Sequence, residues 1–507
     1  MRSSQILSPG IACLLAFTMA CGGPDEMAIA EDQSVDDWIA GVEEALLPAL
    51  FVEGVEPSGY TLAERMENYN VPAISAAVIE NGQIVWAKAW GTADLETGAP
   101  ATTETLFQAA SISKPLAALV ALSLVEDGRL ELDGPANHYL TSWNIPDNEF
   151  TADSAVTLRG ILTHSAGLTV WGFPGYRKDE PFNDEQALAT NAQVLEGEGN
   201  TDPVRVYKVP GTSWQYSGGG YTVMEQMIED VTGGPFHTIA ASRVLQPAGM
   251  TRSTYEQPLP EARWAEAARG HRGDGTEVEG EWHTYPEQAA AGLWTTPTEL
   301  ATLSVHLLRI LDGTVTDGVI TRDMLDRMLT PNHDGEEDFN DWGLGFGLSD
   351  IDGQRAFGHG GANEGFRASW RVFPDLGIGY AIMTNGDRGG ALAGELARAI
   401  AAERGWPVHK VETRARMRPE AGEIAALAGT YEVEGADGLM VEFRPGEDDT
   451  LEISVPGRGT SVWYATSIDE WFDPSDGQEL TVEHDGDGNV TGALIDGTRR
   501  LVRQTDG

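Results

Sequence analysis

The spacing of apolar residues changes after Lys410, and this change constrains the fold more than any other feature of the sequence. Before it, apolar residues recur three and four positions apart, as in residues 224–231, which is typical of helices that pack by one face. After it, residues 427–507 form short alternating runs separated by Gly, Pro and Asp, which is typical of an all-β barrel or sandwich. A chain of 507 residues also exceeds what one hydrophobic core usually serves. We therefore predict a large domain over 36–410, a linker over 411–422 and an all-β, barrel-like domain over 423–507.

The large domain combines a hairpin, several helices and a late group of strands. Asn81-Gly82 lies between two apolar-rich runs, which is the strongest short signal for a hairpin. A long apolar stretch predicts a helix over 111–126. Two alternating runs, 357–373 and 377–385, predict strands. A hairpin at the start, helices in the middle and strands at the end predict an α+β domain whose sheet draws on both ends of the domain.

The N-terminus has the pattern of an export signal. Arg2 is followed by an apolar stretch, residues 11–20, that is too short to span a bilayer. The sequence "TMAC" places Ala20 directly before Cys21, which resembles the cleavage box of bacterial lipoproteins, so we expect a lipid on Cys21. Thr18 stands where that box usually has leucine, and ordinary cleavage followed by secretion is therefore the alternative. We predict a signal over 1–21, a tether over 22–35, and an exported protein anchored to a bacterial membrane, in the periplasm or at the outer membrane.

The formal net charge of −46 argues against one class of partner. Nucleic-acid binding needs a basic surface that neutralises phosphates, and the sequence has no basic patch. A metal site is not expected either, because His271 and His283 lack the i, i+4 spacing of a metal motif. The only cysteines, Cys13 and Cys21, fall within the predicted signal. We expect no cofactor.

Ser111 and Lys114 form the first candidate catalytic pair. They are three residues apart at the start of the predicted helix, and therefore lie on one face, one turn apart. A serine hydroxyl is a poor nucleophile unless a neighbouring base takes its proton. A lysine amine can be that base if apolar surroundings lower its pKa. The alternative is a serine that caps the helix beside a surface lysine, because S-x-x-K alone often occurs by chance.

Three later motifs add to this pair. "LTHSAGL" covers 162–168, "WQYSGGGY" contains Tyr216, and "GHGGANEGF" contains His359. Together and in this order they resemble the class C-like branch of the serine β-lactamase and penicillin-binding superfamily, over roughly residues 35–408. The resemblance implies a β-lactamase-like sheet with flanking helices and a helical subdomain, followed by a lipocalin-like domain. His164, in the first of these motifs, is expected to order its loop by donating a hydrogen bond rather than to catalyse.

The resemblance also implies roles for four side chains. Ser111 would be the nucleophile, and Lys114 and Tyr216 would share the base role, since the resemblance does not distinguish which of them is the working base. His359 stands where the family's K-T-G variant has lysine, and would orient the substrate and help to polarise Tyr216. Its unperturbed pKa of about 6.5 would leave it largely neutral at pH 7, still able to donate a hydrogen bond.

The family pattern further implies a set of backbone positions around the substrate. The N–H groups of Ser111 and Ala362 would form the oxyanion hole. Gly360 and Gly361 would let the substrate backbone approach closely. Gly218 is a departure, because the family's Y-x-N motif has asparagine there, and that amide normally binds an acylamino side chain. Its loss puts recognition of penicillins and peptides in doubt more than ester hydrolysis.

The function expected from these motifs is that of an exported serine hydrolase that forms an acyl-enzyme at Ser111. Its substrates would be small esters or D-amino-acid amides and peptides. The alternatives are a β-lactamase, a non-catalytic sensor that binds penicillin or peptidoglycan, and a purely structural lipoprotein.

Overall fold

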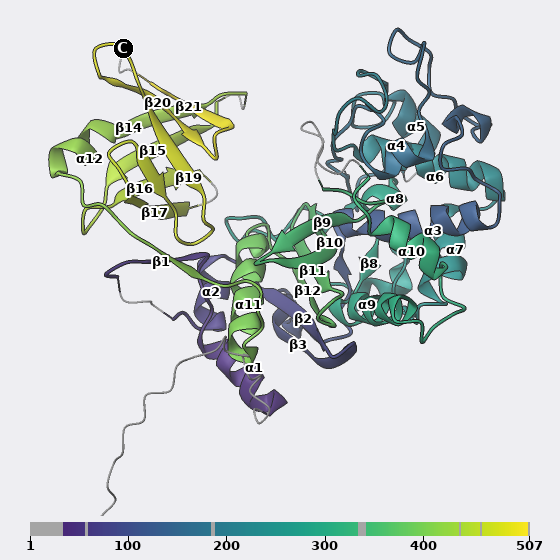
Figure 1. The fold of residues 1–507 in the computed structure, drawn as a ribbon, viewed down its shortest axis with the longest axis horizontal. Helices are drawn as coiled ribbons and strands as arrows, with labels where there is room; N and C mark the ends of the chain where they lie inside the picture. Colours follow the sequence, from purple (N-terminus) through teal and green to yellow (C-terminus); the bar gives the residue numbers. More distant parts are fainter. Residues whose placement is uncertain are drawn as a thin grey trace, which may run out of the picture.

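The computed structural model describes residues 34–55, 59–183, 188–332, 341–435, 438–456 and 459–504. A barrel lies at one end, a sheet in the middle and a group of helices at the other end (Figure 1). The predicted signal, with Cys21, and residues 22–33 of the predicted tether lie outside the described residues. Within the described ranges, no helix has the length and apolar character needed to cross a membrane.

The central sheet has seven strands in the order β4-β3-β2-β12-β11-β10-β9. Asn81 and Gly82 have φ values of 52° and 67° and close the hairpin between β2 and β3, as predicted, since two positive φ values are typical of the favoured hairpin turn. Strand β12 pairs with β2, so the sheet does draw on both ends of the domain. The strands are β2 Ala73–Glu80, β3 Gln83–Asp94, β4 Ala99–Pro100, β9 Gly347–Ile351, β10 Gln354–Asn363, β11 Phe366–Phe373 and β12 Ile378–Thr384.

The run 357–373, predicted as strand, is two strands rather than one. Glu364 and Gly365 form a turn between β10 and β11, and Asn363 pairs with Phe366 across it. Gly365 has φ 78°, and a Cβ there would lie 2.7 Å from the Cα of Gly270. The turn therefore needs glycine at this position for both conformation and space.

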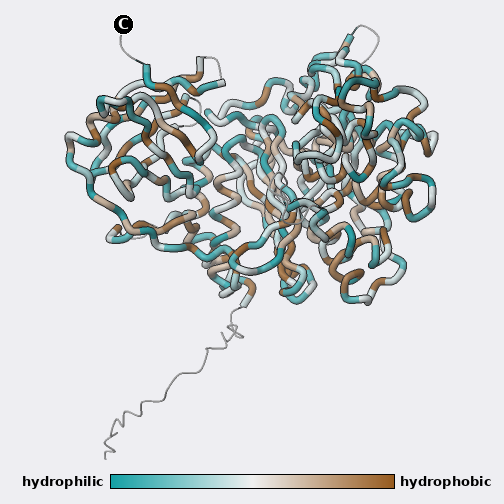
Figure 2. Tube along the Cα trace, turned by 45° about the horizontal axis from the view of Figure 1, so that its top comes forward, coloured by the Kyte–Doolittle hydropathy of each residue, from teal (hydrophilic) through white to brown (hydrophobic). Residues whose placement is uncertain are grey.

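Helices cover both faces of the sheet. On one face, α1, α2 and α11 pack around Trp38 and Leu396. On the other face, α3 and α9 belong to a larger hydrophobic core that extends into the helical end of the domain. Figure 2 shows hydrophilic stretches of the chain around the outside. The helices are α1 Val35–Glu44, α2 Leu62–Asn68, α3 Ser113–Glu126, α4 Leu158–Leu162, α5 Asn191–Glu196, α6 Gly218–Thr232, α7 Phe236–Ala240, α8 Gln288–Ala291, α9 Pro297–Leu311, α10 Arg322–Met328 and α11 Gly389–Arg404.

Short elements complete this domain. The 3₁₀ turn η1, Ala110–Ile112, precedes α3, so the helix predicted over 111–126 begins as a 3₁₀ turn and becomes α-helical only at Ser113. The remaining short helical turns are η2 Ala136–His138, η3 Ala241–Leu245 and η4 Glu261–Glu266. The two-stranded pairs are β5 Phe107–Gln108 with β8 Trp294–Thr295, β6 Tyr176–Arg177 with β7 His283–Thr284, and β1 Leu50–Val52 with β13 Glu412–Arg414.

The C-terminal part is a closed antiparallel barrel of eight strands, which fits the lipocalin-like domain expected from the sequence. Tyr431 and Phe443 stack inside it with ring centroids 4.2 Å apart, beside the buried Trp463 and Trp471. Helix α12, Ala421–Leu427, packs two of its residues into the same core. The strands are β14 Gly429–Val433, β15 Met440–Pro445, β16 Leu451–Val455, β17 Gly459–Ala465, β18 Glu470–Phe472, β19 Glu479–His484, β20 Val490–Ile495 and β21 Arg499–Arg503.

Candidate active site

Ser111 lies in the 3₁₀ turn η1, at the point where the chain passes from β5 into α3. The backbone N–H of Ala109 donates to the carbonyl of Leu293, which ties this turn to the strand pair β5–β8. Ala110, directly before the serine, has φ 49°, a left-handed conformation that is rare for residues other than glycine. Such strain persists where the surroundings enforce it, and it clusters at functional sites. Ser111 itself is half-buried.

Lys114 reaches back from the first turn of α3 to this serine. Its Nζ lies 3.0 Å from Ser111 Oγ and 2.8 Å from the carbonyl oxygen of Ala290, so it hydrogen-bonds both. The residue is only 3% exposed, and burial lowers the pKa of the amine to about 7. A large share of the Lys114 amine is therefore neutral at neutral pH and can accept a proton. A surface lysine beside a capping serine, the alternative left open by the sequence, does not describe this pair.

Tyr216 lies beside Lys114, just before α6. The lysine Nζ is 5.0 Å from the centroid of the tyrosine ring. Burial raises the pKa of the Tyr216 phenol, and a hydrogen bond with the Ser111 side chain offsets part of that rise. The phenol is therefore protonated at neutral pH and can donate a proton. The structure thus brings Ser111, Lys114 and Tyr216 together.

His359 is on β10, in register with Trp370 of β11, and its ring centroid is 6.2 Å from that of Tyr216. Burial and the neighbouring Lys114 lower its pKa to about 3, so the ring is neutral. Its Nδ1 lies 2.5 Å from the carbonyl oxygen of Gly360, which can only accept, so Nδ1 carries the proton. The other nitrogen, Nε2, is buried and holds a lone pair. The single ring proton of the neutral His359 is thus used within the chain, which leaves Nε2 as a hydrogen-bond acceptor.

The glycine-rich end of β10 runs beside the serine turn. A Cβ on Gly361 would come 2.2 Å from the carbonyl oxygen of Ala109, so only glycine permits this close approach. Gly360 is exposed, and a Cβ there would meet nothing nearer than 3.8 Å. Ala362 is also exposed, in register with Arg367 of β11. The structure thus places the strand that carries Ala362 against the turn that carries Ser111, as an oxyanion hole made from both would require.

Gly218 is the first residue of α6, and the structure explains why it is not asparagine. A Cβ there would lie 2.9 Å from the Phe173 ring and 3.1 Å from the carbonyl oxygen of Trp171. The backbone N–H of Gly218 donates to that same carbonyl, over 3.1 Å. The loop at 171–173 therefore fills the space that a larger side chain at 218 would need.

Replacing Gly218 by Asn is expected to lower the free energy of unfolding by about 1–3 kcal/mol, since forcing extra atoms into a packed region costs about that much. It is not expected to create β-lactam hydrolysis, because the loop occupies the place of the new amide. Urea unfolding and turnover of a chromogenic cephalosporin check both parts. A variant of unchanged stability that gains cephalosporin turnover would contradict this explanation.

The sequence did not predict a cluster of aromatic rings around Tyr216. Its ring centroid lies 4.2 Å from that of His164, 6.1 Å from Trp342 and 6.3 Å from Trp214. Trp171, which is 73% exposed, lies 6.0 Å away at the surface. Only Trp214 shares a motif with Tyr216, so spacing along the chain gave no signal for the other rings.

The prediction that His164 orders its loop as a hydrogen-bond donor is wrong in its direction. The backbone N–H of Ser217 donates to His164 Nδ1 over 3.1 Å, so this nitrogen accepts. The proton is therefore on Nε2, which is buried and has no partner within the described part of the chain.

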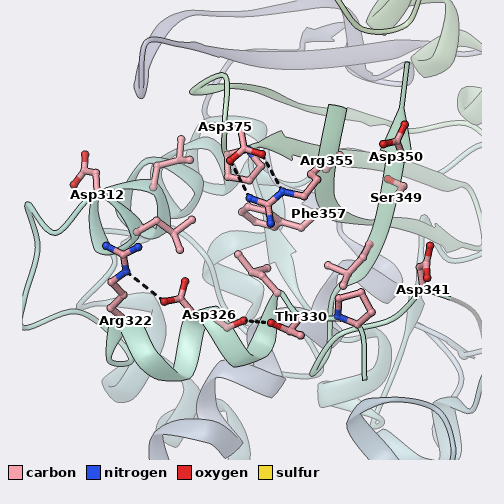
Figure 3. A pocket seen from close by; sticks show the side chains of 17 residues that line it. Asp312, Arg322, Asp326, Thr330, Asp341, Ser349, Asp350, Arg355, Phe357 and Asp375 are labelled. Carbon is pink, nitrogen blue, oxygen red and sulfur yellow. Dashed lines mark hydrogen bonds and ion pairs between the residues drawn. The ribbon is translucent and has the colours of Figure 1, made fainter. Parts of the chain in front are cut away.

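A separate cavity of about 520 Å³ lies between α9, α10 and the β9–β10 hairpin (Figure 3). Two ion pairs form part of its wall, Arg322 with Asp326 and Arg355 with Asp375. Neither Ser111 nor the three side chains gathered around it line this cavity, so it is not the candidate active site.

Comparison with known proteins decides the family. A family model described as Beta-lactamase matches residues 61–405. The chain belongs to the beta-lactamase family. The match contains every residue of the site described above.

Several curated proteins are similar to this chain in sequence. Penicillin-binding protein 4 of Amycolatopsis lactamdurans is 26% identical over 374 residues, which cover 72% of this chain and 94% of the relative. Esterase EstB of Burkholderia gladioli is 31% identical over 191 residues, 37% of this chain and 47% of the esterase. A D-aminopeptidase of Brucella anthropi is 26% identical over 315 residues, 59% of this chain and 54% of the relative. The last two matches span about half of each relative. The family and these relatives identify the chain as a serine hydrolase.

Solved structures show the same fold. The octameric penicillin-binding protein homologue from Pyrococcus abyssi aligns with a TM-score of 0.60 at 22% identity, covering 87% of this chain and 98% of that chain. A D-amino acid amidase from Ochrobactrum anthropi aligns with a TM-score of 0.53 at 22% identity, covering 68% and 97%. At this identity, both similarities concern the fold alone.

Proposed function

We propose that this serine hydrolase transfers an acyl group to Ser111 from neutral carboxylic esters or D-amino-acid amides and peptides, and then hydrolyses the resulting ester. The observation that carries the proposal is the 3.0 Å contact between Lys114 Nζ and Ser111 Oγ, combined with a lysine pKa of about 7. A neutral amine at this distance is a base placed to activate a serine.

The reaction divides into two acyl transfers. Lys114 takes the proton from Ser111 Oγ while the oxygen attacks the substrate carbonyl, and the negative oxygen that forms is held by the N–H groups of Ser111 and Ala362. Collapse of this intermediate breaks the bond to the leaving group, which takes a proton from Tyr216, and the proton on Lys114 returns to the phenolate. Water then attacks the acyl-enzyme by the same route and releases the carboxylic acid. We assign Lys114 rather than Tyr216 as the base because burial lowers the lysine pKa and raises the tyrosine pKa.

Two features of the site favour neutral substrates over penicillins. His359 is neutral where the family's K-T-G variant has an ammonium group, so it offers no charge to a substrate carboxylate. Gly218 offers no amide to an acylamino side chain, and a site without that hydrogen bond cannot prefer substrates that need it. The net charge of −46 repels anions further at low salt. The esterase and the D-aminopeptidase among the relatives agree with this range of substrates.

A nitrophenyl ester is therefore expected to show a higher kcat/KM than a chromogenic cephalosporin. The measurement compares both substrates, and a nitroanilide of a D-amino acid, at low and high ionic strength. A preference for the cephalosporin at both salt concentrations would identify a β-lactamase instead. Acylation by all three substrates without deacylation, seen as a persistent mass increase, would identify a sensor.

We also propose that the protein is exported and carries a lipid on Cys21, with secretion as the alternative. The support is the sequence alone, namely the apolar stretch over 11–20 followed by "TMAC". Metabolic labelling with an alkyne fatty acid tests this proposal. Label that persists in a Cys21→Ser variant, or a wild-type protein without label, would overturn it.

A further inference from the structure

We propose that His164 is a positioning residue that holds the Tyr216 hydroxyl against Ser111. This inference rests on the proposed function, since it concerns how the proton donor of that reaction is kept in place. It assigns to His164 a role different from the ordering of its own loop.

His164 hydrogen-bonds the backbone on both sides of Tyr216. Its carbonyl oxygen accepts a hydrogen bond from the backbone N–H of Gln215 over 2.7 Å. Its ring nitrogen Nδ1 accepts another from the backbone N–H of Ser217 over 3.1 Å. One residue thus fixes both neighbours of the tyrosine, one with its backbone and the other with its side chain.

The His164 ring also supports the tyrosine ring directly. The two centroids are 4.2 Å apart with an interplanar angle of 32°, a close ring contact. Ring contact on one face and two hydrogen bonds to the flanking backbone leave the Tyr216 ring little freedom to move away from Ser111.

His164 is itself held rigidly. It is 2% exposed, and its ring contacts those of Tyr221, at 5.3 Å, and Trp342, at 4.9 Å. It follows the short helix α4, and its backbone N–H donates to the carbonyl of Ile161. Its φ of 57° is in the left-handed region. A strained conformation at a buried residue that touches a reactive side chain is an observation that points to function.

The hydrogen bond from the Ser217 N–H requires a neutral imidazole, because a protonated ring could not accept at Nδ1. Burial, together with Lys114 on α3 and His359 on β10, holds the pKa of His164 well below its usual range. The other titratable groups that face it, Tyr216 and Tyr221, have pKa values raised by burial and stay uncharged. The positioning contact therefore persists throughout the pH range in which Lys114 titrates.

The test is a double-mutant cycle on hydrolysis of a nitrophenyl ester, using His164→Phe and Tyr216→Phe. Phenylalanine keeps a ring but removes the acceptor, so the tyrosine should shift. Misplacement of a reacting group by about 1 Å can cost about 10²-fold. In the wild-type background, His164→Phe is expected to lower kcat about 10–100-fold with little change in KM. In the Tyr216→Phe background, the same substitution should lower kcat by less than about twofold. The midpoint of the acid limb of the pH profile, which reports Lys114, should not move.

Two further variants keep the test decisive. His164→Asn serves if the Phe variant does not fold, because asparagine tolerates the left-handed backbone. It removes the ring that contacts Tyr216, so kcat should again fall, and this fall should again disappear in the Tyr216→Phe background. His271→Phe is the matched control, because His271 is also buried and hydrogen-bonded to backbone oxygens but lies outside the ring cluster. An equal loss of kcat in both backgrounds, or no loss at all, would overturn the positioning role. Unchanged activity in Tyr216→Phe alone would instead contradict the proposed function.

Discussion

Replacing Ser111 by Ala is expected to abolish both ester hydrolysis and labelling by a fluorophosphonate probe, while leaving the protein folded. The hydroxyl is the atom on which Lys114 and Tyr216 converge, so the Ala variant lacks the oxygen that the base would activate. The Ser111 hydroxyl is not a helix cap, so its loss should lower the free energy of unfolding by about 1 kcal/mol at most.

Ser113 provides a matched control two residues away. Its Oγ is buried, donates to the carbonyl of Ala110 and accepts from the N–H of Leu293. Ser113→Ala should therefore lose about 1–3 kcal/mol of stability, because it leaves a buried N–H without a partner, yet keep its labelling. Labelling that survives in Ser111→Ala, or that disappears only in the Ser113 variant, would refute the assignment of the nucleophile.

Replacing Lys114 by Met is expected to lower kcat/KM about 10²–10⁴-fold, the usual contribution of a positioned proton acceptor. The same change should raise stability. The folded-state pKa of about 7 is below the ordinary lysine value, so below pH 7 the folded protein carries a charged amine in a buried place. Methionine has a similar length and no charge to bury, so we expect the free energy of unfolding to rise by roughly 1–3 kcal/mol at pH 7 and below.

The gain should depend on pH in a defined direction. Between the folded pKa of about 7 and the ordinary value of about 10.4, the unfolded chain binds the proton that the folded protein has released, so wild-type stability rises with pH. The advantage of Lys114→Met should therefore shrink as the pH approaches 10. Urea unfolding of both proteins at pH 6, 8 and 10 measures it. A Met variant that is less stable at every pH, or that keeps wild-type activity, would contradict a buried lysine base.

Local signals in the sequence were sufficient for the parts of the fold that depend on neighbours in the chain. Asn81-Gly82 predicted a turn because both residues tolerate positive φ, and the structure has them at 52° and 67°. Ser111 and Lys114 were predicted to meet because residues three apart share a helical face, and they do, although through a 3₁₀ turn. Alternation after Lys410 predicted a barrel-like domain, and eight strands close into one.

Features that depend on contacts between distant segments were not predicted. From the sequence, Gly218 was interpreted only as the loss of the asparagine amide of the family motif. The structure shows that the loop at 171–173 fills the space beside Gly218, and no sequence pattern near residue 218 reveals this loop. The protonated nitrogens of His164 and His359 depend on which backbone groups lie beside each ring, and this is settled only by tertiary structure. The turn at Gly365 interrupts a run whose alternation continues on both sides, so periodicity alone did not show it.

The most direct test of the central claim is to locate a trapped acyl or phosphonyl group within the chain. The wild-type protein is treated with a fluorophosphonate, digested, and analysed by tandem mass spectrometry, with Ser113→Ala treated in parallel. We expect one adduct per molecule, on Ser111 in both proteins, forming faster as the pH rises through about 7, because Lys114 then becomes neutral. An adduct on any other residue, or no adduct from a folded protein, would contradict the account.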